Sequence, residues 1–362
     1  MFKVVLDQRH FVDEPSILIY KKDDKSYALD AYSKKIVSSS TDDSTVFQDA
    51  IDAVGTGELV AVRSGKYHFN AVVDVKDRAL HARGRAEITG RGFKVDGGGS
   101  IVGFKLVNTV GTAIDVAGGG VTVAFNIIEY PSEDGIRVNG DVGAENFYVG
   151  NIIQSAGRYG INFERTGTSD VGGHYFRENL IGNLSETMRS KAGVRLYGPQ
   201  HSASYIWWLG NVIDAIKDGP AILIEGVTPV NICGWNWITT AKNNTPIIDV
   251  KNCDRLILKD ATLAGPSGCV GVMFRGVNDT AFIDGVFTRG ISRLFALDTG
   301  AVVYNKAVGP MLFIDVPNPS DINAYLYLDG VRVFTSAGAT PAGYLEVRIG
   351  TSSYRIPLHP LA

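Results

Sequence analysis

An asparagine followed by two apolar residues recurs along this sequence and constrains its fold more than any other feature. The motif begins at Asn126, Asn151, Asn179, Asn211 and Asn236, and a polar turn and a short alternating strand follow each copy. Strand centres fall at Ile114, Ile136, Ile161, Val194, Ile222, Ile248, Val272 and Phe295, with steps of 22, 25, 33, 28, 26, 24 and 23 residues. Such a period, carried by short strands and tight turns, predicts a solenoid whose stacked coils share one core.

About three short strands fit into each coil, which predicts an all-β fold, the right-handed parallel β-helix. The composition agrees with this prediction, because glycine makes up 42 of 362 residues, about 12% against a usual ~7%. Many tight turns require glycine. The repeat resembles that of parallel β-helix proteins of the pectin-lyase-like superfamily, and the resemblance covers roughly residues 40 to 310.

An amphipathic helix is predicted directly before the first coils. Asp42 to Ser44 offer N-caps, and Val46, Phe47, Ala50, Ile51 and Val54 fall on one helical face. An apolar face with a polar back suits a helix that covers the open end of a solenoid core. Thr41-Asp42-Asp43, the helix, and the strand ending in Gly65-Lys66-Tyr67 closely resemble the N-terminal cap of phage tailspikes and related polysaccharide-degrading β-helices. That family often has proline where this chain has Ser64, and the motif identifies architecture rather than activity.

The chain divides into three predicted parts. Residues 1–41 form a β-hairpin leader, with strands at 16–20 and 26–30. Residues 42–310 form the capped solenoid, and residues 311–362 form a small antiparallel β module with strand pairs at 324–328/331–334 and 344–349/354–357. The last pair resembles the C-terminal ends of viral fibre and β-helix proteins. In such proteins this module often joins three chains, so the resemblance implies a homotrimer.

Charge and cysteine content exclude several classes of function. The formal net charge is −3, and the Lys and Arg residues are scattered, so nucleic acid is not an expected partner. Cys233, Cys253 and Cys269 have neither disulfide nor zinc spacing, and no metal or cofactor is expected. No apolar run approaches the length of a membrane span, and there is no recognisable signal peptide. If the protein works outside a cell, something other than a signal peptide takes it there, and a virion would do so; with the resemblance to tailspikes, the expected location is a virion or another extracellular surface.

Strand alternation assigns the candidate catalytic and sugar-binding residues to outward columns. The first column is Asp115, Arg137, Asn162, Arg195, Leu223 and Asp249; the second is Asn139, Glu164, Tyr197, Glu225, Lys251 and Arg275. Glu164 and Glu225 are the candidate acid and base, two coils apart. Arg137, Asn162, Arg195 and Tyr197 are candidate substrate contacts. The competing interpretation is that any solvated sheet face carries charges.

Aromatic residues form a further pair of columns. Phe147, Tyr175 and Trp207 are predicted to face outward and Tyr148, Phe176 and Trp208 inward. The outward set fits either subunit packing or sugar stacking. The asparagine column is interpreted as structural, because stacked amides can bond the next coil. Residues 184–191 extend one loop, which fits either a binding insertion or a tolerated surface loop.

Two functions fit these patterns. The first is a tailspike-like protein that binds surface polysaccharide. As an enzyme, it would also cleave this polysaccharide, either as a hydrolase or as a lyase. The second is a non-enzymatic structural spike or adhesin. Two acidic side chains that converge on one face would favour the first function, whereas a uniformly mixed surface would favour the second.

Overall fold

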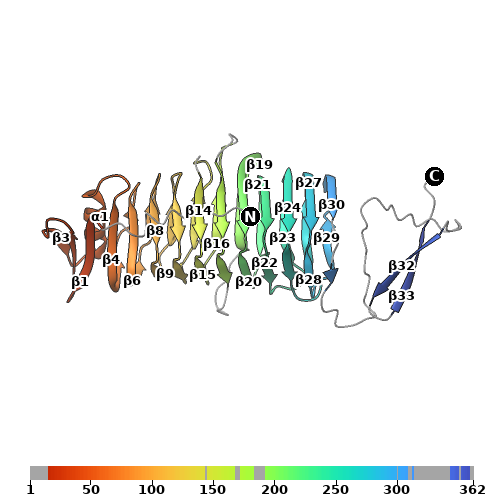
Figure 1. Ribbon diagram of the computed structural model, residues 1–362, viewed down its shortest axis with the longest axis horizontal. Helices are drawn as coiled ribbons and strands as arrows, with labels where there is room; N and C mark the ends of the chain where they lie inside the picture. The colour runs from red at the N-terminus through yellow and green to blue at the C-terminus, as the bar shows by residue number, and fades with distance from the viewer. Residues whose placement is uncertain are drawn as a thin grey trace. The chain divides into compact units, whose positions relative to one another are not determined.

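The computed structural model describes residues 15–142, 145–167, 172–182, 192–299, 301–308, 312–313, 343–349 and 352–358. The chain divides into two compact units, residues 1–323 and 324–362. In the first unit, strands β1 to β31 belong to one continuous hydrogen-bonded sheet that winds into a parallel solenoid (Figure 1). The predicted all-β parallel β-helix is therefore confirmed.

Each complete coil contributes a strand to each of three parallel ladders. Ladder 1 contains β5 (Val73–Asp74), β7 (Phe93–Val95), β10 (Ile114–Val116), β13 (Ile136–Asn139), β16 (Tyr159–Glu164), the first part of β19 (Ala192–Leu209), the first part of β21 (Ile222–Cys233), β23 (Pro246–Lys251), β26 (Val270–Arg275) and β29 (Arg293–Leu297).

Ladder 2 contains the first parts of β4 (Leu59–Phe69) and β6 (Ala79–Gly90), then β8 (Ser100–Val102), β11 (Thr122–Ala124), β14 (Asn146–Val149), β17 (His174–Arg177), the later parts of β19 and β21, β24 (Arg255–Lys259), β27 (Val277–Asp284) and β30 (Val302–Val308). Ladder 3 contains the later parts of β4 and β6, then β9 (Lys105–Thr109), β12 (Ile127–Glu129), β15 (Ile152–Gln154), β18 (Leu180–Gly182), β20 (Val212–Ile216), β22 (Asn236–Thr240), β25 (Ala261–Ala264), β28 (Phe287–Arg289) and β31 (Leu312–Phe313).

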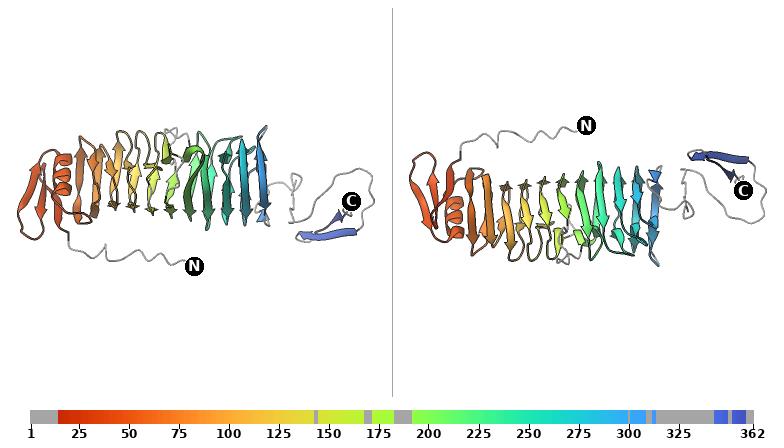
Figure 2. Two further views of the ribbon diagram at one scale, coloured as in Figure 1. Left: turned by 90° about the horizontal axis from the view of Figure 1, so that it is seen from above. Right: turned by 90° about the horizontal axis from the view of Figure 1, so that it is seen from below.

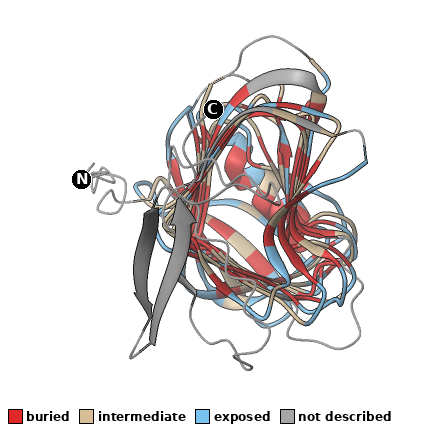
Figure 3. Cartoon of the chain, turned by 90° about the vertical axis from the view of Figure 1, so that its right-hand side faces the viewer, coloured by how far each residue is buried: buried red, intermediate tan, exposed pale blue. Residues whose placement is uncertain are grey.

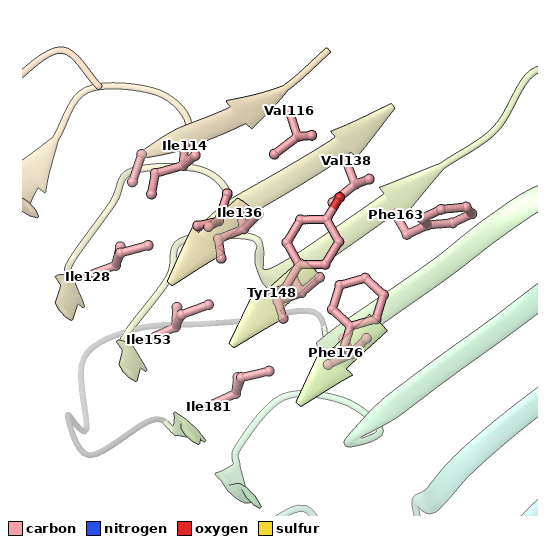
Figure 4. Close-up of a cluster of buried hydrophobic side chains, with 14 of the residues drawn as sticks. Ile114, Val116, Ile128, Ile136, Val138, Tyr148, Ile153, Phe163, Phe176 and Ile181 are labelled. Carbon is pink, nitrogen blue, oxygen red and sulfur yellow. The ribbon is translucent and has the colours of Figure 1, made fainter. Parts of the chain in front are cut away.

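One apolar core runs through the coils. The strand centres from Ile114 to Val272 pair with one another in the predicted register, and all are buried. Phe295 continues this file but is only partly buried. Side chains of the three ladders meet in the interior, as the close-up in Figure 4 shows. Figure 3 views the coils end-on and marks the buried residues of the strands in red. The register read from the sequence is confirmed.

Glycine precedes several of these strand centres because the corner between ladders 3 and 1 has no room for a side chain. A Cβ atom on Gly135 would lie 2.4 Å from a methyl carbon of Ile153, and one on Gly160 would lie 2.4 Å from a methyl carbon of Ile181. The carbonyl oxygens of Gly160 and Gly193 lie almost as close to these two positions, at 2.6 and 2.8 Å. Close packing in the core therefore requires glycine at these positions.

The corner between ladders 2 and 3 is held by the asparagine column, and the predicted structural role is confirmed. Asn126, Asn151, Asn179, Asn211 and Asn236 are all buried. The Asn151 side chain accepts from the backbone N–H and the amide of Asn126, both at 3.1 Å, and donates to the Val123 carbonyl and to the Asn179 amide oxygen. The residue before each asparagine has a positive φ, as at Gly150 (63°) and Gly210 (62°), which bends the chain sharply.

The N-terminal end is closed by the predicted helix. Helix α1 (Asp43–Asp52) has Asp42 as its N-cap, and the predicted apolar face from Val46 to Val54 is buried. The Phe47 ring packs edge-on against the rings of Tyr67 and Phe69, with ring centroids 5.2 and 4.8 Å apart. The buried Asp43 carboxylate accepts hydrogen bonds from Ser26, Lys21 and the His68 backbone. The helix therefore joins the first coils to the hairpin that precedes it (Figure 2).

That hairpin has the predicted strand pairing. Strands β1 (Ile17–Lys22) and β2 (Lys25–Asp30) are antiparallel, and β3 (Ile36–Ser40) pairs with β2. Strand β1 also pairs in parallel with β4, so the hairpin continues the sheet of the solenoid. The domain boundaries at residues 41 and 310 remain predictions.

In the second unit, β32 (Gly343–Ile349) and β33 (Ser352–Leu358) pair in antiparallel fashion, as predicted for residues 344–357. The other predicted pair, at residues 324–334, and the predicted loop insertion at 184–191 lie outside the described residues.

Candidate functional site

The outer face of ladder 1 carries the residues predicted to act on a substrate. Asp115, Arg137, Asn162, Arg195, Leu223 and Asp249 are consecutive partners across six strands, and so are Asn139, Glu164, Tyr197, Glu225, Lys251 and Arg275. Both predicted columns therefore exist in the order read from the sequence. Neighbouring members are one strand spacing apart, ~4.8 Å.

Arg195 lies at the centre of this face and is held on several sides. Its guanidinium carbon is 4.3 Å from the ring centroid of Tyr197 and 5.6 Å from that of Tyr159. Its Nη1 donates to the Asn162 amide oxygen at 3.3 Å and is 3.4 Å from a carboxylate oxygen of Glu164. Stacking on two aromatic rings orients a guanidinium while its remaining N–H groups stay available. The Arg195 side chain is 19% exposed.

Asn162 requires a correction. It was predicted to contact substrate, but its side chain is fully buried beneath its neighbours. Its amide donates to Asp134 at 2.9 Å, and its oxygen accepts from Arg195. Because no surface of Asn162 reaches solvent, its side chain positions Arg195 rather than binding a ligand.

Asp134, Arg158 and Tyr159 support this face and were not identified from the sequence. The Asp134 carboxylate is buried and accepts two hydrogen bonds from the Arg158 guanidinium as well as the bond from Asn162. These bonds raise the pKa of the Arg158 guanidinium. Arg158 also lies 5.7 Å from the ring centroid of Tyr159. Each of these residues is at a strand end or in a turn. The two-residue alternation of a strand does not predict which way a side chain points there, so the sequence pattern could not identify them.

The two candidate catalytic carboxylates are accessible and each contacts a cation. The side chains of Glu164 and Glu225 are 42% and 33% exposed. Tyr197 lies between them in the column, so the two glutamates are separated by two strand spacings, ~9.6 Å. Glu164 contacts Arg195, and Glu225 accepts from Lys251 at 2.6 Å, a hydrogen bond that raises the pKa of the lysine.

Further ion pairs cross the coils at both ends of the face. Arg137 donates two hydrogen bonds to Asp115, at 2.8 and 2.7 Å, which raise the pKa of its guanidinium. Arg275 contacts both Asp249 and Asp298, at 2.8 and 2.5 Å. The face therefore presents both signs of charge, with most carboxylates matched by a cation of an adjacent coil.

The predicted aromatic column faces outward on ladder 2. Trp207 is 38% exposed, Phe147 and Tyr175 are half-buried, and the rings of Phe147 and Tyr175 stack with centroids 5.1 Å apart. The inner set of Tyr148, Phe176 and Trp208 is buried, as predicted. Because the column belongs to a different ladder, the structure does not unite it with Glu164 and Glu225 on one sheet face.

A cleft of about 480 Å³ near the N-terminal end is lined by Leu18, Ala61, Arg63 and Arg83, among others, and by none of the predicted site residues. Within the described residues, no three His, Cys, Asp or Glu side chains gather as a metal ion would require, and no helix is long and apolar enough to cross a membrane.

Comparison with known proteins adds likenesses of fold. No family model matches the sequence, and no curated protein matches it. Similar solved structures include ORF18 of Geobacillus virus E2, with 13% identity, a TM-score of 0.46, and coverage of 75% of this chain and 59% of that chain. A PL6 alginate lyase in complex with a trisaccharide has 11% identity and a TM-score of 0.45, with 87% and 89% coverage. PfbA, a surface adhesin of Streptococcus pneumoniae, has 11% identity and a TM-score of 0.34, with 87% and 96% coverage.

This chain thus spans 59% of the length of the viral protein. All three likenesses concern the solenoid fold, and none extends to a shared function.

Proposed function

We propose that this chain binds polysaccharide as part of a tailspike-like spike on a virion or another extracellular surface. The observation that carries the proposal is the arrangement around Arg195 on ladder 1. A partly exposed guanidinium is oriented by two tyrosine rings and lies beside an accessible carboxylate. Such groups can donate to and accept from sugar hydroxyls without first being ordered, which lowers the entropic cost of binding.

Arg195 has a definite role in this proposal. Its guanidinium would donate to hydroxyl oxygens of the glycan or form a charged hydrogen bond to an acidic substituent. Glu164 and Glu225 would accept from hydroxyl groups on either side. Because charges of both signs are distributed along the coils, the face is suited to a polar, extended ligand rather than to an apolar one.

A screen of immobilised polysaccharides tests the proposal. We expect the wild-type protein to retain at least one polysaccharide and Arg195→Ala to bind it at least about tenfold more weakly, since one charged hydrogen bond contributes ~1.5–3 kcal/mol. Arg255→Ala is the matched control, because it removes an equally charged, exposed side chain from ladder 2. Equal affinities of the two variants would remove Arg195 from the binding site, and no retention of any polysaccharide would contradict the function itself.

Polysaccharide cleavage is the second candidate function, and one observation favours it. Glu164 and Glu225 are both accessible in one column, ~9.6 Å apart at the backbone. Inverting glycosidases hold their acid and base carboxyls ~6.5–9.5 Å apart. In the alternative lyase reaction, Arg137 and Arg195 would neutralise a uronate. The same screen separates these reactions, because hydrolysis releases reducing ends and elimination releases unsaturated products that absorb in the ultraviolet.

Binding ranks ahead of cleavage because of the ion pairs. Glu164 and Glu225 each contact a cation, and paired charges continue to both ends of the face. A mixed, paired surface is what the non-enzymatic spike or adhesin predicts.

The spike is further proposed to be a homotrimer. The outward aromatic column of ladder 2 offers apolar surface for a neighbouring chain, and the second unit is a candidate joining module. A closed symmetric assembly would bury such surfaces in every copy. Light scattering should give about 117 kDa, three times the chain mass of 38.9 kDa, and Trp207→Lys should shift the mass toward one chain. A stable wild-type monomer at micromolar concentration would count against the trimer.

A further inference from the structure

The turn before Asn236 is one residue longer than its counterparts in the coils that precede it. Leu209 is aligned with Cys233, and Asn211 with Asn236, in the strand pairings on either side of the corner. One residue, Gly210, lies between the first two of these positions, but Gly234 and Trp235 both lie between Cys233 and Asn236. The equivalent turns at Gly150 and Glu178 also have a single residue. The chain therefore bulges by one residue at this turn.

Trp235 occupies this turn in a conformation that tryptophan disfavours. Its φ is +58°, and Gly234 before it also has a positive φ, of 77°. The same left-handed conformation recurs before the other asparagines of the column, as at Phe125 and Glu178, so the turn requires it, although it is costly for a bulky residue. The indole is also 76% exposed, so it adds little to the core. Neither folding nor packing accounts for a tryptophan here.

Aromatic and polar groups lie near this turn, on its own coil and on the next two coils. Its ring is nearly parallel to that of Phe287, with centroids 6.4 Å apart and planes 17° apart. Trp237, two residues along the chain, is 41% exposed, and Thr262 lies between it and Phe287 in ladder 3. Asp260 occupies the same turn position one coil further on, next to the exposed Lys259.

We propose that Trp235, Trp237, Phe287 and Asp260 form a second glycan-binding site, the Trp235 platform, on the corner between ladders 2 and 3. The indole faces would stack on the C–H faces of pyranose rings. The Asp260 carboxylate and the Lys259 ammonium would bond the hydroxyl groups at the ring edges. This inference rests on the proposed function and adds a site away from ladder 1, which holds Arg195.

The size and composition of the platform favour a sugar over a protein partner. From Trp237 to Phe287 the platform spans only two coils, ~9.6 Å. A stable protein interface is much larger and buries ~800 Å² on each partner. The charged Lys259 and Asp260 also lie in the adjacent turn, directly before the strand that contains Thr262, and the centres of protein interfaces are depleted of charge. Flat rings edged by charged hydrogen-bonding groups match an amphipathic sugar ring.

Trp235→Gly gives a test in which stability and binding change in opposite directions. Glycine adopts a positive φ without strain, so the midpoint of thermal unfolding should rise, by about 2–4 °C. Affinity for the polysaccharide found in the screen, and for maltohexaose and cellohexaose as defined neutral probes, should fall at least about tenfold for whichever of these the wild-type protein binds. Tryptophan side chains often dominate the interfaces they occupy.

Phe125→Gly is the matched control. Phe125 occupies the same turn position four coils earlier, with φ of 56° and 46% exposure. This variant should gain stability in the same way and keep its affinity for the glycan.

The outcomes separate this inference from the proposed function. Full affinity in Trp235→Gly, with loss of affinity in Arg195→Ala, would overturn the platform and leave the function intact. No glycan binding by the wild-type protein would overturn both. A change in the mass of Trp235→Gly, with unchanged glycan affinity, would assign the corner to a subunit contact instead.

Discussion

Asn151→Leu should lower the free energy of unfolding by about 3 kcal/mol or more. Leucine has a similar size but can neither donate nor accept, and the site is fully buried. The Val123 carbonyl and the Asn126 backbone N–H would each lose the hydrogen bond that Asn151 provides, and the amides of Asn126 and Asn179 would each lose one of theirs. Each buried polar group left unsatisfied costs ~1–3 kcal/mol. Chemical denaturation followed by circular dichroism measures the change.

Asn243→Leu is the control for this loss. Asn243 is exposed, so the same substitution should change stability by less than about 0.5 kcal/mol. If both variants lost the same small amount, the asparagine column would not hold the coils together. Because coils of a solenoid can unfold separately, the comparison should use the full transition curves and not the midpoints alone.

For the cleavage hypothesis, Glu164→Gln and Glu225→Gln should each lower turnover by about 10²–10⁴, the usual contribution of a general acid or base. Glutamine keeps the shape of the side chain but cannot exchange a proton. The two carboxylates flank Tyr197 on one face, so one could protonate the leaving oxygen while the other activates water. The rate of reducing-end release from the polysaccharide identified in the screen is the measurement.

Glu129→Gln controls for the loss of an ion pair as such. Glu129 contacts Lys105 at 2.8 Å on ladder 3, and its replacement should leave turnover unchanged. Turnover within about tenfold of wild type in both Glu164→Gln and Glu225→Gln would remove these residues from the mechanism. Binding that survives in the same variants would then support the adhesin.

The sequence alone determined which side chains of the strands point into the core and which point outward. Successive side chains of a strand point to opposite faces, so one correct position, such as Ile161, places Asn162 and Glu164 outward and Phe163 inward. The repeat then carried this assignment from coil to coil, even across the 33-residue step to Val194. The capping helix could also be predicted from local sequence, because its N-cap and its apolar face lie within residues 42 to 54.

Only the tertiary structure decided what lies at the corners and how deep each outward residue sits. Alternation ends where the chain bends, so it could not show that Asp134 binds both Asn162 and Arg158, or that Gly160 makes room for Ile181. It also could not align turns of different length, and the additional residue in the turn that contains Trp235 emerged only from the strand pairings on both sides. Contacts at corners join residues 20 to 40 positions apart, and their geometry depends on how the coils stack.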